Sequence, residues 1–125
     1  MSNHSLKDAA IDFLRQIVAG DIKGAYARYV GEGFRHHNPY FPGDAASLRA
    51  GMEDDEKRNP GKILSVQCAI QDGDRVAVHS RLQRPHGEPD ISVVHIFRFE
   101  AGRIVEAWDV AMQAPAQIVN QHGLF

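Results

Sequence analysis

The spacing of apolar residues changes at Gly61, and this change constrains the fold more than any other feature of the sequence. Before Gly61, apolar side chains recur every three or four positions, as they do along one face of a helix. After Gly61, apolar and polar residues alternate, as in strands that bury one face. We therefore expect helices in the first half of the chain and a sheet in the second.

Three helices are expected before Gly61, each starting at a residue whose side-chain oxygen can cap the first turn. From the cap to the last residue they run from Ser5 to Val18, from Asp21 to Tyr29 and from Asp44 to Lys57. The intervening segment 34–43 contains two prolines and has no clear period. It is expected to form an ordered loop or a short strand.

Four strands are expected after Gly61, and short turn segments separate them. They cover residues 62–70, 75–82, 91–99 and 103–112. A parallel pair would need a crossover of about a dozen residues or more, so these short connections predict an antiparallel meander. Three helices on one side of a strongly curved, mainly antiparallel four-stranded sheet define an α+β fold with an internal pocket, which is either hollow or filled by side chains. We expect a single domain over residues 1–125.

Composition excludes several classes of partner. The chain has 14 Lys and Arg against 16 Asp and Glu, which lacks the basic excess that nucleic-acid binding requires. Its apolar runs are far shorter than the roughly 20 residues that span a bilayer, so no membrane association is expected. The N-terminal segment lacks the apolar centre of a secretory signal, which favours a cytoplasmic protein. Cys68 is the only cysteine and cannot form an intramolecular disulfide.

The last expected strand places one carboxylate in an apolar row. Asp109 shares a face with Val105, Ala107 and Ala111. A carboxylate in such surroundings must be paired, protonated or chemically active.

The opposite face of that strand is also largely apolar. It carries Ile104, Trp108, Val110 and Met112. An outward apolar band of this size predicts that a second copy of the chain covers it in a homodimer.

His95 lies among apolar residues on the preceding strand, and its position relative to Asp109 depends on the turn at residues 100–102. A three-residue turn places His95 opposite Ala107 and diagonal to Asp109. A two-residue turn pairs His95 with Trp108 and sends Asp109 to the other face. Glu-Ala-Gly lacks the Asn-Gly or Asp-Gly signature of a tight turn, so the three-residue form is favoured.

The sequence contains seven histidines, so a metal centre is an alternative hypothesis for the function of these residues. The candidates are His36, His37, His79 and His95, together with Asp109. No pair of histidines has the two-residue strand spacing or four-residue helix spacing that commonly supplies two ligands. We therefore expect neither a metal nor a cofactor. His79 is able to reach either the pocket or the solvent.

The chain resembles SnoaL-like proteins of the nuclear transport factor 2-like superfamily. The likeness rests on Arg-His-His-Asn-Pro at 35–39, Val-His-Ser-Arg at 78–81 and the stretch 96–110 with its Glu-Ala-Trp-Asp. It implies a cone-shaped sheet closed by helices, usually in a homodimer, with a pocket at the wide end. The chain departs from the family pattern at Ala107, where many relatives have histidine, and at His95, where many have aspartate.

The same resemblance implies roles for three residues. Polyketide cyclases of this kind close a ring by an intramolecular aldol reaction without metal or cofactor. Their acid–base aspartate matches Asp109, the assisting histidine matches His95, and the histidine of the His-Asn-Pro loop matches His37.

These residues suggest proton abstraction next to a carbonyl group. Apolar neighbours are expected to strip water from Asp109 and make it a stronger base, while His95 or His37 hydrogen-bonds to the enolate oxygen. A flat apolar small molecule is the expected substrate. The predicted pocket residues are His79, Phe13, Tyr26, Phe34, Tyr40 and Phe97. The alternative is a non-catalytic small-molecule binding protein, in which Asp109 and the histidines orient a ligand or pair with one another.

Overall fold

The three expected helices are present in the computed structural model, which describes residues 5–125. They are α1 (Leu6–Val18), α2 (Ile22–Tyr29) and α3 (Ala45–Arg58). The side chains of Ser5, Asp21 and Asp44 each accept a hydrogen bond from the backbone N–H three residues on. Such caps satisfy donors that the first helical turn leaves free, so the predicted helix starts are confirmed.

The sheet has five strands in the order β1-β5-β4-β3-β2, one more than the sequence predicts. They are β1 (Val30–His36), β2 (Ile63–Asp72), β3 (Arg75–Gln83), β4 (Ile91–Glu100) and β5 (Arg103–Gln113). β2 to β5 form the predicted antiparallel meander. The additional strand β1 pairs with β5 in parallel. Its pairing is irregular between Val30 and Arg35, and its two glycines hide the alternation typical of a strand.

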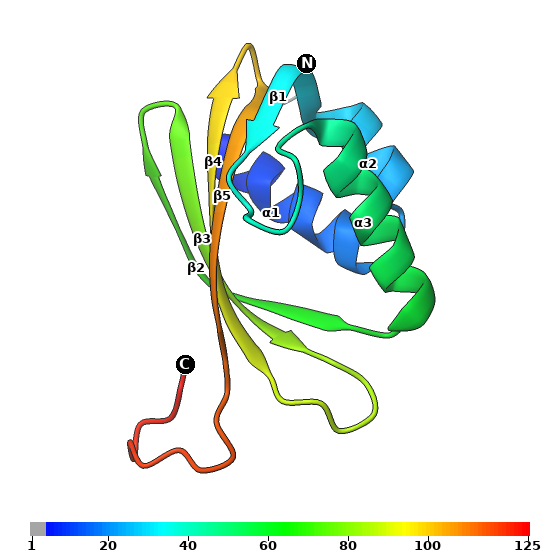
Figure 1. The fold of residues 1–125 in the computed structure, drawn as a ribbon. Helices are drawn as coiled ribbons and strands as arrows, with labels where there is room; N and C mark the ends of the chain where they lie inside the picture. The colour runs from blue at the N-terminus through cyan, green and yellow to red at the C-terminus, as the bar shows by residue number, and fades with distance from the viewer. Residues whose placement is uncertain (1–4) are drawn as a thin grey trace.

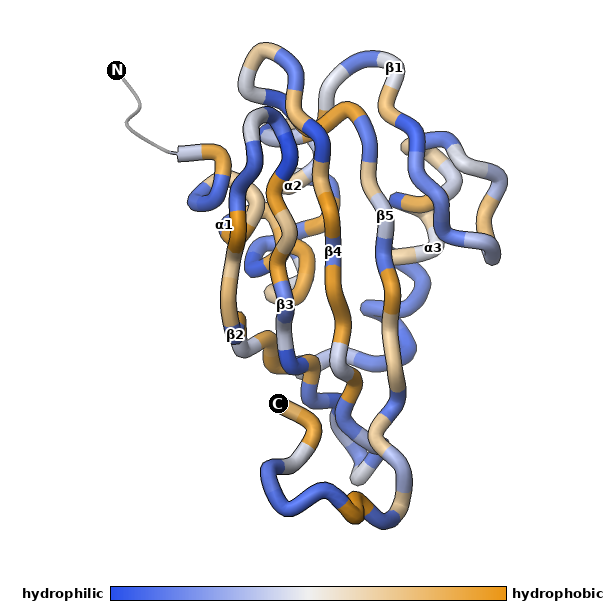
Figure 2. Tube along the Cα trace, turned by 90° about the vertical axis from the view of Figure 1, so that its left-hand side faces the viewer, coloured by the Kyte–Doolittle hydropathy of each residue, from blue (hydrophilic) through white to orange (hydrophobic). Residues whose placement is uncertain are grey.

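All three helices cover one face of the curved sheet, which we call the inner face (Figure 1). Among residues 5–125, no helix lies on the opposite face, which we call the outer face, and the segment after β5 lies on this side (Figures 1 and 2). The α+β class is therefore confirmed. Phe13 of α1 packs edge-on against Phe97 of β4 with ring centroids 5.6 Å apart, which ties the helical layer to the inner face. Within residues 5–125, no helix combines the length and apolar character needed to cross a membrane.

The β4–β5 hairpin differs from the prediction at its turn. Ala101 and Gly102 both have positive φ, 50° and 78°, so the connection is a tight two-residue turn. Glu100 pairs with Arg103. The three-residue turn predicted from Glu-Ala-Gly is wrong.

A β-bulge then shifts the register by one residue. Phe99 pairs with Ile104, but Arg98 pairs with Glu106, so Val105 is the extra residue. Beyond the bulge His95 lies directly opposite Asp109, and both face inward. The tight turn would have sent Asp109 outward, and the bulge reverses this.

The bulge also changes the predicted outer face of β5. Ile104 is completely buried in the core and does not face outward with Trp108. At the bulge, the side chains that face inward change from even-numbered to odd-numbered residues of β5. Val110 and Met112 are exposed, as expected. The outward apolar band on β5 therefore begins at Trp108.

Candidate functional site

A cavity of about 410 Å³ lies between the helices and the inner face. This is within the range of roughly 300–1,000 Å³ that small-molecule pockets occupy. Its lining includes the aromatic residues Phe13, Tyr26, Phe34, Phe41 and Phe97. Four of the predicted pocket residues, Phe13, Tyr26, Phe34 and Phe97, therefore lie on the wall of this cavity. Tyr40 is 86% exposed and lies outside the cavity, and the neighbouring Phe41 lines it instead.

His95 and Asp109 bring polar groups to this apolar wall from adjacent strands. The His95 ring stacks on Phe97 at a centroid distance of 5.7 Å. Burial lowers the pKa of His95 from its usual 6.5 to about 4, and the nearby Asp109 carboxylate offsets only part of this. His95 is therefore a neutral imidazole at pH 7. Its Nδ1 is buried and has no hydrogen-bond partner within residues 5–125.

Asp109 is exposed, so the expectation that apolar neighbours desolvate it is wrong. It lines the cavity where the cavity meets solvent. Its position is set by Asn38, whose Nδ2 donates to Asp109 Oδ2 at 3.0 Å. The orientation of the Asn38 side-chain amide is fixed, because its Oδ1 accepts a hydrogen bond from the Tyr40 backbone N–H at 3.0 Å. Asp109 Oδ2 thus accepts a hydrogen bond, whereas Oδ1 has no hydrogen-bond partner within residues 5–125.

The two adjacent histidines at the end of β1 lie on opposite sides of the sheet. His36 ends β1 on the inner face, is buried, and lines the cavity. His37 faces outward, where its Nε2 lies 2.6 Å from Glu106 Oε2 and its ring stacks on Trp108 at 5.0 Å. The expectation that His37 serves the pocket is wrong. The alternation that places Phe34 and His36 inward would have indicated His36, had residues 34–36 been recognised as a strand.

The SnoaL-like domain family matches residues 10–107, which is most of the chain. The protein belongs to this family. Among functionally curated proteins, none has a sequence that matches this SnoaL-like chain significantly.

Several solved structures are similar to it. AclR from Streptomyces galilaeus, called a putative hydroxylase, superposes with a TM-score of 0.74 at 22% identity, covering 86% of this chain and 88% of that chain. IdmH from Streptomyces antibioticus, called a putative polyketide cyclase, gives a TM-score of 0.72 at 20% identity, covering 86% of this chain and 92% of that chain. A putative polyketide cyclase from Acidithiobacillus ferrooxidans gives a TM-score of 0.70 at 21% sequence identity, covering 89% of this chain and 91% of that chain. At these identities the likeness shows the fold.

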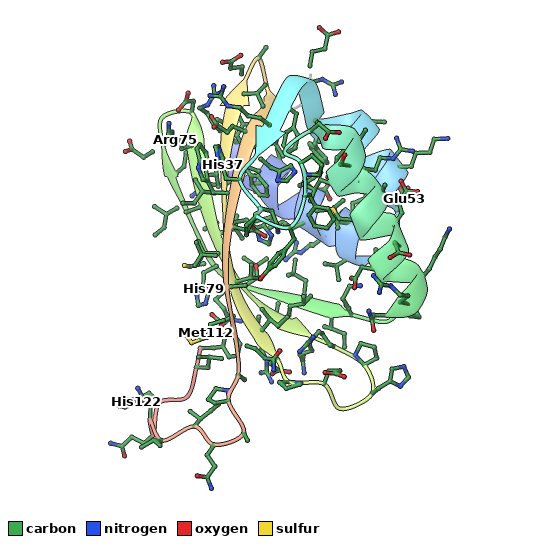
Figure 3. All side chains as sticks on the ribbon, in the orientation of Figure 1. His37, Glu53, Arg75, His79, Met112 and His122 are labelled. Carbon is green, nitrogen blue, oxygen red and sulfur yellow. The ribbon has the colours of Figure 1, made fainter. Side chains whose placement is uncertain are left out.

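His79 of this SnoaL-like protein lies on the outer face, and its predicted place in the pocket is wrong. Its Nε2 lies 2.9 Å from Ser92 Oγ, and its ring stacks on Phe125 at 6.2 Å. Figure 3 shows His79 and Met112 on the side of the sheet that carries no helix. The candidate histidines are thus divided between two faces. Within the described residues, no group of three or more His, Cys, Asp and Glu side chains is arranged to hold a metal ion.

Glu106 is the centre of a charged cluster on the outer face that the sequence did not indicate. Its buried carboxylate accepts hydrogen bonds from Arg35 at 2.9 Å and Arg98 at 3.0 Å, in addition to its contact with His37. Arg35 and His37, followed by Arg98, hold the pKa of Glu106 at about 2. The cluster joins β1, β5 and β4, so we assign His37 a structural role in this SnoaL-like fold.

Proposed function

We propose that this protein is a cofactor-independent acid–base enzyme that removes a proton next to the carbonyl group of a flat, apolar substrate. The observation that carries the proposal is the pair of Asp109 and His95, a carboxylate and a neutral imidazole directly opposed on the wall of an apolar cavity. Aldol cyclisation, isomerisation and dehydration all begin with such a step. The polyketide cyclase names of similar structures support this reaction class.

The arrangement suggests how the proton moves. Asn38 occupies Oδ2 of Asp109, so Oδ1 takes the proton from the substrate carbon and later returns it. His95 is neutral and donates a hydrogen bond to the oxygen that gains charge as the enolate forms, as neutral imidazoles can. A positioned general base contributes a factor of roughly 10² to 10⁴ in rate. The exposure of Asp109 means that a bound substrate must itself exclude water from the carboxylate.

The test is exchange of carbon-bound hydrogen for deuterium. Aryl ketones such as 2-acetylnaphthalene are incubated in D₂O, and loss of the α-proton signal is followed by NMR. We expect exchange above the buffer rate, in proportion to protein concentration. If several aryl ketones bind in the cavity and none exchanges, the enzyme proposal is rejected.

That negative result would favour a non-catalytic binding protein for small apolar molecules. One observation supports this second candidate: Asp109 already has a hydrogen-bond partner in Asn38. A carboxylate of this kind can orient a ligand without taking its proton. The cavity itself serves both candidates equally.

We further propose that a second copy of the chain covers the outer face. Ile70, Val110 and Met112 are 65%, 72% and 57% exposed, and they lie on the same face across β2 to β5. Exposed apolar surface of this extent is typical of interfaces between subunits.

Val110→Glu tests the dimer. The wild type is expected to sediment as a dimer at micromolar concentration and the variant as a monomer, because a charge at the centre of an apolar interface loses its hydration. Ala27→Glu is the control, since Ala27 is exposed on α2, which lies on the other side of the sheet. A monomeric wild type would exclude the dimer.

A further inference from the structure

His36 is a buried polar residue of the cavity wall that has no part in the proton transfer described above. Its exposed fraction is 7%, and its ring lies between the rings of Phe34 and Phe41 at centroid distances of 6.2 and 6.4 Å. All three residues line the cavity. His36 is paired with Ala107, two residues before Asp109, so it lies roughly 6–7 Å along β5 from the carboxylate.

The hydrogen bonds of the loop determine the tautomer of His36. Its Nδ1 lies 3.0 Å from the backbone N of Asn38, which can only donate. Nδ1 therefore carries no proton, and the ring proton is on Nε2. This Nε2–H is buried and has no hydrogen-bond partner within residues 5–125. Most buried polar groups are satisfied, so an unpaired donor in a cavity wall needs an explanation.

The other charges of the cavity indicate what kind of acceptor this donor fits. Two cationic side chains, Lys62 and Arg58, also line the cavity. Lys62 is bound to Asp55 and Glu56, and Arg58 is bound to an acid of its own helix. No described cation is therefore left free to bind an anion there, and the carboxylate of Asp109 repels one.

We propose that His36 is a second ligand-binding residue, whose Nε2–H donates a hydrogen bond to an uncharged oxygen acceptor such as a ketone carbonyl. The inference rests on the proposed function for the carbonyl character of the substrate. A ligand oxygen that reaches Nε2 gives this donor the partner it lost on folding. Asn38 then organises both polar ends of the site, because its backbone sets the His36 tautomer and its side chain orients Asp109.

Two isosteric probes test the inference, 2-acetylnaphthalene and 2-isopropenylnaphthalene, which differ by an oxygen in place of a CH₂ group. Calorimetry should show that the wild type binds the ketone roughly 3- to 10-fold more tightly, the range for one neutral hydrogen bond. His36→Phe keeps an aromatic ring between Phe34 and Phe41 and should lose most of this preference. His37→Phe is the matched control, because its ring lies on the outer face. It should retain the preference.

A second measurement needs no variant. In the wild type, the Nε2–H resonance of His36 should move downfield when the ketone binds and stay in place with the alkene. An equal affinity for the two probes, or an undiminished ketone preference in folded His36→Phe, overturns the inference. Proton exchange is measured separately. If the ketone preference depends on His36 but no exchange occurs, this inference stands and the enzyme proposal is rejected. If exchange occurs without a ketone preference, the enzyme proposal stands and this inference is rejected.

Discussion

Replacing Asp109 by asparagine is expected to lower the rate of α-proton exchange by a factor of about 100 or more while leaving ligand affinity within a few-fold. Asparagine keeps the shape of the side chain, and its amide oxygen still accepts the hydrogen bond from Asn38. It has no basic oxygen for the substrate proton. The change therefore separates binding from proton abstraction.

Stability provides the control for this variant. Asp109 is exposed, so its replacement should change the free energy of unfolding by no more than about 0.5 kcal/mol. Asp72→Asn, at an exposed aspartate that does not line the cavity, should leave both rate and stability unchanged. An unaltered exchange rate in Asp109→Asn would remove Asp109 from the mechanism, whatever happens to binding.

Ile104→Ala is expected to destabilise the fold by about 2–5 kcal/mol, the usual cost of truncating a buried isoleucine. Ile104 has no exposed surface and belongs to the core cluster. Val110→Ala is the matched control, because Val110 lies on the same strand at another even-numbered position. Val110 is 72% exposed, so its truncation should cost no more than about 0.5 kcal/mol in the monomer.

This comparison tests the bulge at Val105 directly, since without it Ile104 and Val110 would face the same way. Unfolding in urea should be followed at several protein concentrations, which separates the loss of core packing from any loss of dimer contacts. Equal costs at the two positions would show that β5 has no register shift. The inward direction of Asp109 would then be wrong as well.

The helices and the meander were predictable because their signals are local. A capping side chain and the N–H it binds are three residues apart, and the strands of the meander follow one another along the chain. The bulge has no comparable signal, because packing of Ile104 and Ala107 against the same core decides it. Strand β1 was missed because its partner β5 is distant in sequence and only part of β1 pairs regularly.

The errors in the site follow from these two causes. Asp109 and His95 were identified from alternation within recognised strands, and the structure brings them together. The family resemblance points to His37, and residues 34–43 show no clear period that would distinguish His36 from His37 or Phe41 from Tyr40 by the direction in which they face. In the sequence, Asn38 stands out only as part of the Arg-His-His-Asn-Pro segment. Its role depends on a contact with Asp109 that no local pattern encodes.

The parallel pairing of β1 with β5 has a consequence for how the cavity forms and opens. The bond between Asn38 and Asp109 joins residues 71 positions apart, so this wall can form only after a large loop has closed. β1 is also an edge strand, bonded to a neighbour on one side only. Its amide protons should accordingly exchange with solvent faster than those of the central strand β4. Because β1 is bonded within the sheet to β5 alone, we expect its local detachment to widen the opening of the cavity beside Asp109 while the meander stays folded.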